Sequence, residues 1–245
     1  MIFQFLYTYA ENNIDIRKAY VLNLNNEIIY EKRRIMRTMK KMSKYLAAVL
    51  AIMMCVGLSA CGLKFDAAGY TKSALDANYQ GKYEEYADFR GISVDEAKKE
   101  IEDNKVKLAK QQLVTMGITD DESVNNYLEN VKGIEKLAKY DVKESEKQKD
   151  GSYIIKIEVQ PSNAYQILQE NSATVAQEMV AAGKDVSDSS VFMELLIESI
   201  NRSVAANEYG EAQTVEVKVT KGSGNTYGLE QSEIDKIEEA MFPQS

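Results

Sequence analysis

Residues 140–161, YDVKESEKQKDGSYIIKIEVQP, carry the clearest secondary-structure signal of the 245-residue chain. Hydrophobic side chains alternate there with polar ones at Tyr140, Val142, Tyr153, Ile155, Ile157 and Val159. Asp150-Gly151 between the two runs is a strong hairpin turn signal. Pro161 ends the second run, because proline cannot donate to a strand ladder. We therefore predict an antiparallel hairpin with one buried face.

A second, shorter hairpin is predicted near the end of the chain. Val215, Val217 and Val219 alternate with Glu or Lys, and the turn Gly222-Ser223-Gly224 leads into a short strand through Tyr227. Helical spacing fills the remaining sequence, which gives the order helices, hairpin, helices, hairpin, helix. This order predicts an α+β fold, with helices packed on one face of a small antiparallel sheet built from two hairpins.

Helices are predicted where apolar residues recur at spacings of three and four. The segments are 67–90, 94–116, 122–137, 164–182, 187–204 and 230–241. The motifs Ser93-Val94-Asp95-Glu96 and Thr119-Asp120-Asp121-Glu122 both match the capping box that begins a helix. Gly81 weakens the first helix or splits it in two. The wide apolar stripe of 191–204 is typical of a central core helix.

Composition excludes several classes of function. The chain has 30 Lys and Arg residues, 38 Asp and Glu residues, and no histidine. Without histidine, neither a Ser-His-Asp triad, a Cys-His nucleophile nor a histidine metal ligand can form. The formal net charge of −8 argues against a nucleic-acid partner, which requires a basic surface.

The acidic charge is concentrated in the C-terminal part of the chain. Residues 1–60 hold nine Lys and Arg and four Asp and Glu, which leaves 21 basic and 34 acidic residues in 61–245. The net charge of 61–245 is therefore −13. A surface of this sign favours cationic partners and is repelled by anionic lipid head groups.

A signal peptide is predicted in residues 36–60. The basic cluster 37–44 precedes the apolar run 45–58, YLAAVLAIMMCVGL, whose 14 residues are fewer than the roughly 20 needed to span a membrane. Small residues then lead to a cysteine in Leu58-Ser59-Ala60-Cys61, which resembles the lipobox of bacterial lipoproteins. The resemblance implies that diacylglycerol is attached to Cys61 and that the leader is cut just before it. The alternative is a short transmembrane helix with an incidental cysteine.

The 35 residues before this leader are unusual, because signal peptides begin with their basic region. We expect the true start at Met36 or Met39, with residues 1–35 untranslated; the alternative is an extended, disordered leader. The predicted organisation is then a signal peptide at 36–60, a lipidated tether at 61–68 and a single extracytoplasmic domain at 69–245. Its location is the outer side of the cell membrane, held by lipid on Cys61.

The mature part also resembles a group of lipoproteins of unknown function from low-GC Gram-positive bacteria. Residues 75–86 fit the pattern Leu-Asp-Ala-x-Tyr-x-Gly-x-Tyr-x-x-Tyr, and the capped segment 93–97 follows within the resembling stretch 70–99. The hairpin motif Asp150-Gly151-Ser152-Tyr153 fits the same group. The resemblance implies helices against a curved antiparallel sheet, as in cystatin-like or NTF2-like folds, and it implies no activity.

Tyr79, Tyr83 and Tyr86 are the candidate ligand-binding residues. Their rings recur at spacings of four and three, so they line one side of a helix and offer an aromatic platform for a flat ligand. The same spacing is typical of the buried face of a helix, which is the competing interpretation.

Catalytic, cofactor-binding and metal-ligating residues are not predicted. The acidic run 120–122 lacks the alternating ligands and central glycine of an EF-hand. The acidic pairs are expected on exposed faces or at helix N-termini, where carboxylates are favoured; they are Glu84-Glu85, Asp95-Glu96, Asp120-Asp121 and Glu238-Glu239.

Three functions therefore remain open. The first is a non-enzymatic binding module that takes a cationic peptide, a protein or a glycan. The second is a carboxylate-based hydrolase of cell-wall glycans, which needs two carboxylates about 5 to 9.5 Å apart in a cleft. The third is a structural or assembly factor of the cell envelope.

Overall fold

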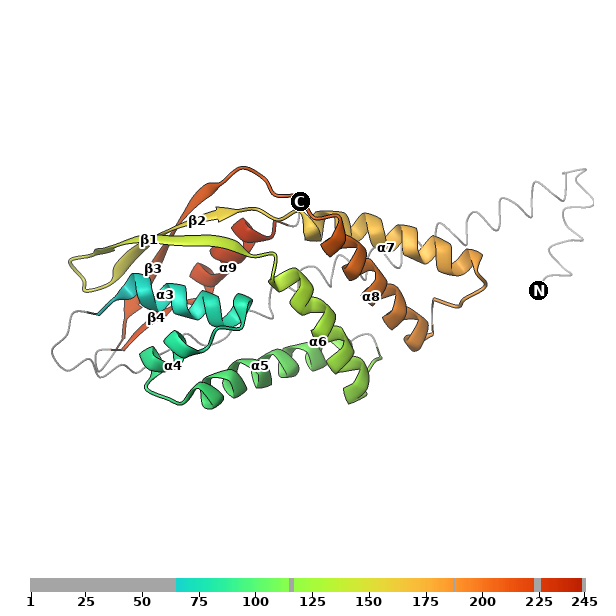
Figure 1. Cartoon of the computed structure of the whole chain (residues 1–245), viewed down its shortest axis with the longest axis horizontal. Helices are drawn as coiled ribbons and strands as arrows, with labels where there is room; N and C mark the ends of the chain where they lie inside the picture. Colours follow the sequence, from blue (N-terminus) through green and yellow to red (C-terminus); the bar gives the residue numbers. More distant parts are fainter. Residues whose placement is uncertain (1–64, 115–116, 187, 223–225, 244–245) are drawn as a thin grey trace, which may run out of the picture. The chain divides into compact units, whose positions relative to one another are not determined.

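The computed structural model describes residues 65–114, 117–186, 188–222 and 226–243. Within them the chain forms seven α-helices, one π-helix and four strands, in the α+β order expected from the sequence (Figure 1). The helices are α3 (Ala67–Leu75), η2 (Asp76–Gln80, the π-helix), α4 (Glu84–Arg90), α5 (Val94–Val114), α6 (Asp121–Glu135), α7 (Ala164–Ala181), α8 (Ser189–Ala205) and α9 (Gln231–Met241). The strands are β1 (Lys139–Lys147), β2 (Tyr153–Gln160), β3 (Gln213–Lys221) and β4 (Tyr227–Leu229).

The four strands form one antiparallel sheet in the order β1-β2-β3-β4. The predicted hairpin between β1 and β2 is confirmed, and its turn depends on Gly151, which has a φ of +85°. The carboxylate of Asp150 accepts a 3.0 Å hydrogen bond from the amide of Ser152 and holds the turn. A bulge interrupts the ladder between Val142 and Ser145. The second hairpin, β3 and β4, joins the first because residues 213–219 of β3 pair with β2.

One face of the sheet is buried. The inward side chains of β2 are those expected from the alternation, Tyr153, Ile155, Ile157 and Val159, and all four are buried. Helix α3 packs against β1 and β2, and α9 packs against β2 and β3. Phe65, just before α3, stacks on Tyr227 with ring centroids 4.1 Å apart and closes one end of this core. The prediction of helices on one face of the sheet is therefore confirmed.

The first predicted helix, 67–90, is divided into three parts. Asp66 caps α3 by accepting a 2.9 Å hydrogen bond from the amide of Gly69. The helix then widens into η2 and ends at Gly81, which takes the left-handed conformation with a φ of +65°. A side chain with a β-carbon rarely adopts this conformation. Gly81 therefore splits the predicted helix, and α4 begins as a separate helix after it.

The two predicted capping boxes have different outcomes. At the start of α5, the amide of Ser93 donates to Glu96 Oε2 at 2.9 Å and the amide of Glu96 donates to Ser93 Oγ at 3.2 Å, so this box is confirmed. At the start of α6 the capping residue is Asp120, one residue later than expected, and its carboxylate accepts from the amide of Ser123 at 2.8 Å. A carboxylate caps as well as a hydroxyl and adds a favourable interaction with the helix dipole.

Helices α7 and α8 lie side by side, and α8 also packs against α6 (Figure 1). Leu195, Leu196 and Ile200 of α8 are fully buried in this layer. The wide apolar stripe predicted a central core helix, but Phe192 and Ile197 on the same helix are only half-buried. The stripe is wide because α8 contacts both α6 and α7 and leaves part of its apolar surface uncovered. The layer of α6, α7 and α8 is called the three-helix region below.

Candidate functional site

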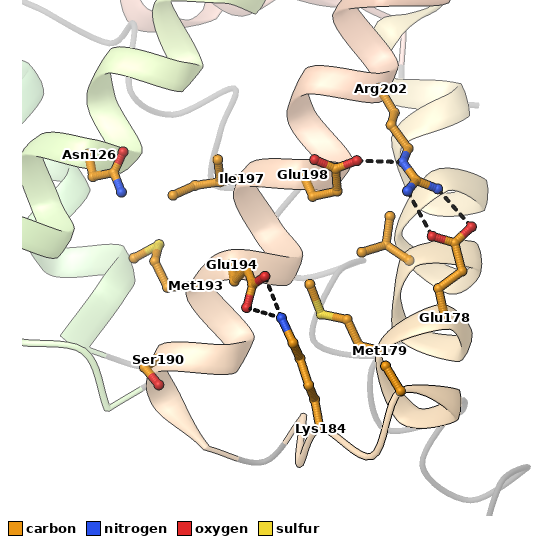
Figure 2. Close-up of a pocket in the computed structure, with 12 residues that line it drawn as sticks. Asn126, Glu178, Met179, Lys184, Ser190, Met193, Glu194, Ile197, Glu198 and Arg202 are labelled. Atoms are coloured by element: carbon orange, nitrogen blue, oxygen red, sulfur yellow. Dashed lines mark hydrogen bonds and ion pairs between the residues drawn. The ribbon is translucent and has the colours of Figure 1, made fainter.

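A groove with a volume of about 560 Å³ runs along α7 and α8 in the three-helix region (Figure 2). Its volume lies in the range of roughly 300 to 1,000 Å³ that is usual for ligand sites. Side chains of α8 line it at positions 190, 193, 194, 197, 198 and 202, and side chains of α7 at 175, 178, 179 and 182. Both sets follow the spacing of a single helix face. Lys184 from the α7–α8 loop and Asn126 from α6 complete the lining.

The apolar part of the groove comes from both helices. Val175 and Met179 of α7 and Met193 of α8 are buried, while Ile197 is half-buried. Methionine side chains are unbranched and polarizable, so they adapt to apolar surfaces of different shape. The groove therefore has a largely buried apolar floor, in which Ile197 is the most exposed of these four side chains.

A three-residue ion-pair network lies at one end of the groove. Arg202 of α8 donates two hydrogen bonds to Glu178 of α7, at 3.0 and 2.7 Å, and a third to Glu198 at 2.8 Å (Figure 2). The guanidinium lowers the pKa of the Glu178 carboxyl, and the two carboxylates raise the pKa of Arg202. All three side chains are at least one-third exposed, so water screens these interactions.

The other end of the groove carries a second ion pair. Lys184 Nζ lies 2.5 and 2.7 Å from the two carboxylate oxygens of Glu194 (Figure 2). Lys184 reaches α8 because Gly183, with a φ of +78°, ends α7 in the left-handed conformation and redirects the chain. The groove thus combines an apolar centre with three carboxylates, one ammonium and one guanidinium.

Binding suits this chemistry better than acid catalysis does. A glycoside hydrolase needs one carboxyl group with a raised pKa that can act as the general acid. In this groove Arg202 shifts the pKa of Glu178 in the opposite direction. The hydrolase interpretation therefore gains no support from the groove.

The three candidate tyrosines do not share one helix in the structure. Tyr79 lies in η2, Tyr83 precedes α4 and Tyr86 lies in α4, with the break at Gly81 between the first two. The exposed fractions of Tyr79 and Tyr86 are 4% and 2%, and Tyr83 is half-buried. Burial raises the pKa of all three hydroxyl groups. Cys61, the expected lipid attachment site, lies outside the described residues.

A buried polar cluster joins η2 to α5 and α6. Lys105 Nζ of α5 lies 2.7 Å from Glu135 Oε2 of α6, and both side chains are over nine-tenths buried. The same ammonium donates a 2.7 Å hydrogen bond to the carbonyl oxygen of Asn78 in η2. Asn78 lies in the last turn of η2, where carbonyl groups lack helical partners. Lys105 therefore satisfies a carbonyl in η2 and a carboxylate in α6 together.

Glu238 of α9 is buried, although both members of the pair Glu238-Glu239 were expected to be exposed, so that prediction is wrong for Glu238. The exposed fraction of Glu238 is 4%, and its Oε1 atom has no hydrogen-bond partner within the described residues. Burial and, to a smaller extent, the charge of Asp235 raise the pKa of Glu238 to about 9. Glu239 is exposed as expected.

The sequence contained a signal for some of the missed residues. Glu238 lies four residues after Ile234 and three before Met241, on the apolar line of α9, so its burial follows from helical spacing. Lys105 lies four residues after Ile101 and four before Ala109 on the buried face of α5, so its burial also follows from helical spacing. The contact between Glu178 and Arg202 has no such signal, because the two residues are 24 positions apart.

Among the helices in the part of the chain that the structure describes, none has both the length and the apolar character to cross a membrane. In the same part, His, Cys, Asp and Glu side chains form no group of three or more that could hold a metal ion.

Comparison with known proteins gives one structural match. No protein-family model matches the chain, and no curated protein matches it either. The structure does match a crystal structure from Bacillus subtilis described as a "putative lipoprotein (ycdA)", with a TM-score of 0.54 and 18% sequence identity. The match covers 72% of this chain and 56% of that one, so the chain spans little more than half the length of its match. At this identity the likeness establishes the fold: the chain shares an α+β architecture with a protein described as a lipoprotein of a Gram-positive bacterium.

Proposed function

We propose that this chain is a lipid-anchored extracytoplasmic protein whose α+β domain is a binding module without enzymatic activity. The observation that carries the proposal is the segment 45–61, in which an apolar run of signal-peptide length leads to Leu58-Ser59-Ala60-Cys61. The fold shared with a protein described as a lipoprotein supports the anchor. The groove in the three-helix region, apolar at its centre and charged at both ends, supports the binding role.

The anchor also agrees with the charge of the domain. A single acyl chain gives marginal membrane binding, whereas two or more acyl chains hold a protein stably at a membrane. The net charge of −13 over 61–245 keeps the protein surface away from anionic head groups, so lipid on Cys61 would be the attachment point. We expect such a domain to face partners in the extracytoplasmic space.

Metabolic labelling with palmitate tests the anchor. The wild-type chain should incorporate label, the variant Cys61→Ser should not, and the matched control Cys55→Ser should incorporate as much as the wild type. Cys55 is the appropriate control because it lies inside the apolar run of the leader. Wild-type protein without label, or label that persists in Cys61→Ser, would refute the lipid anchor. Mass spectrometry of the N-terminal peptide should find Cys61 as the first residue.

A finer fold assignment is also part of the proposal. We propose that the sheet and its covering helices belong to the cystatin-like or NTF2-like class. The antiparallel order β1-β2-β3-β4, with α3 and α9 packed against its strands, supports this assignment. An experimental structure in which the sheet is flat and does not curve around a helix would contradict it.

A further inference from the structure

The groove is long in relation to its volume. Its lining on α8 extends from Ser190 to Arg202, which at about 1.5 Å per residue is about 18 Å, or a little over three helical turns. On α7 it extends from Val175 to Ala182, about 10 Å by the same rise. A compact small molecule would occupy part of such a length. A segment of helix lying along α8 would occupy all of it.

The apolar centre of the groove has the spacing that a second helix requires. Met193 and Ile197 are four residues apart on the side of α8 toward Asn126, and Met179 of α7 lines the groove on the other side of α8 (Figure 2). An amphipathic helix presents its apolar side chains at intervals of three and four residues, which matches this spacing. Ile197 is half-buried, so it can bury further area against a partner.

The charges of the groove favour a cationic partner. Glu178, Glu194 and Glu198 outnumber Lys184 and Arg202, and the mature part of the chain is strongly acidic. Each intramolecular ion pair at the two ends is exposed, and exposed pairs contribute little to stability because water screens them. Breaking these pairs to form ion pairs with a partner therefore costs little free energy.

We propose that this groove binds a cationic amphipathic helix of a partner protein, with apolar side chains on Met179, Met193 and Ile197 and with Lys or Arg side chains on Glu194 and Glu198. The proposal rests on the proposed binding role and adds the class of partner and its place on the domain. Bound in this way, the partner helix lies along α8, and its basic side chains extend toward the carboxylates at the ends of the groove.

Peptide binding to the whole chain in nanodiscs of neutral phosphatidylcholine tests the proposal. The probe is a fluorescent peptide of about fourteen residues made of Leu and Lys, with the Leu residues on one helix face. A peptide of equal composition with scrambled order and a Leu and Glu peptide of the same pattern serve as comparisons. We expect saturable binding of the first peptide alone, and an affinity that falls as salt is raised.

Two variants with matched controls locate the site. Ile197→Lys should weaken binding about tenfold or more, because it places a like charge in the apolar centre. Val180→Lys, on α7 outside the groove and 50% exposed, should leave the affinity within about twofold. The double variant Glu194→Gln/Glu198→Gln should weaken binding and flatten its salt dependence, whereas Glu170→Gln, on an exposed part of α7, should do neither. Circular dichroism checks that each variant is folded.

Several outcomes would overturn the proposal. They are equal binding of the scrambled peptide, tighter binding of the Leu and Glu peptide, equal loss in Val180→Lys and Ile197→Lys, or binding to empty nanodiscs at the same level. Binding to empty nanodiscs would show that the peptide binds the lipid surface and not the protein. Palmitate labelling is measured independently of peptide binding, so a failed groove and a failed lipid anchor give different results.

Discussion

The sheet region, which consists of β1–β4 with α3 and α9, and the three-helix region bury their apolar residues in different ways. In the sheet region the inward residues of β2 are buried to completion under two helices. In the three-helix region α8 keeps half-buried apolar residues beside exposed ion pairs. A surface that is not completely covered remains available for association. The comparison indicates that the first region supplies stability and that the second supplies the binding surface.

The ion pair between Lys105 of α5 and Glu135 of α6 ties the three-helix region to α5 and should have the largest single effect on stability. Lys105→Met leaves the Glu135 carboxylate buried and unpaired, which costs about 3 to 5 kcal/mol of unfolding free energy. The double variant Lys105→Met/Glu135→Leu should recover most of that loss. Urea unfolding measures both. A loss below about 1 kcal/mol in the single variant would show that the pair is not buried as described.

Truncation in the sheet region tests whether its buried face supplies stability. Ile155→Ala should lower the free energy of unfolding by about 2 to 5 kcal/mol, since it removes a fully buried side chain from the central part of the sheet. Ile154→Ala is the matched control, because Ile154 lies on the opposite face of β2 and is half-buried. Equal losses in the two variants, measured by urea unfolding, would contradict a one-sided core.

Glu238 makes the sheet region less stable as pH rises. Its pKa is about 9 in the folded chain and near 4.5 when unfolded, so folding retains a proton that the unfolded chain loses. The penalty is absent below pH 4.5, grows with pH and is complete near pH 9. Tyr79 of η2 and Tyr165 of α7 face Glu238. Burial and the nearby carboxylates raise the pKa of both tyrosine hydroxyl groups.

Glu238→Gln should therefore stabilise the chain, by about 3 kcal/mol at pH 7 and by little below pH 4.5. The exposed neighbour offers a matched control, because Glu239→Gln should show no such pH dependence. Thermal or urea unfolding between pH 4 and 9 measures the difference. A constant difference between Glu238→Gln and wild type across this range would contradict the raised pKa.

The smallest effect is expected in the three-helix region. Arg202→Gln removes the exposed ion pairs to Glu178 and Glu198 and should lower the free energy of unfolding far less than Lys105→Met does, and less still in high salt. Urea unfolding at low and high ionic strength measures this. A loss as large as that of Lys105→Met would mean that the network holds α7 and α8 together, and the contrast between the two regions would then be wrong.

Local patterns predicted the sheet region well, because its determinants are local. The alternation around Ile155 and the turn at Asp150-Gly151 are sufficient to place a hairpin and its buried face. The capping box at Ser93 is predictable for the same reason, because both of its hydrogen bonds join residues three positions apart. The order of the strands could not be predicted from such patterns, because the pairing of β2 with β3 joins residues about sixty positions apart.

The candidate site was predicted less well, because it depends on tertiary contacts. The three tyrosines at helical spacing were expected on one helix, but the π-helix and the left-handed Gly81 separate them. The groove residues Glu178 and Arg202 meet only because α7 and α8 pack side by side. Only the link between Glu198 and Arg202, four positions apart on α8, was within reach of sequence spacing.

The bulge in β1 has a consequence for copies of the chain that meet one another. β1 is the terminal strand of the sheet, and such a strand presents unpaired amide and carbonyl groups that another chain can use to extend the sheet. The bulge after Val142 disturbs the regular spacing of these groups, and the charged side chains of 143–147 keep a second strand at a distance. The β1 edge is thus a poor template for a strand from a neighbouring copy of the chain.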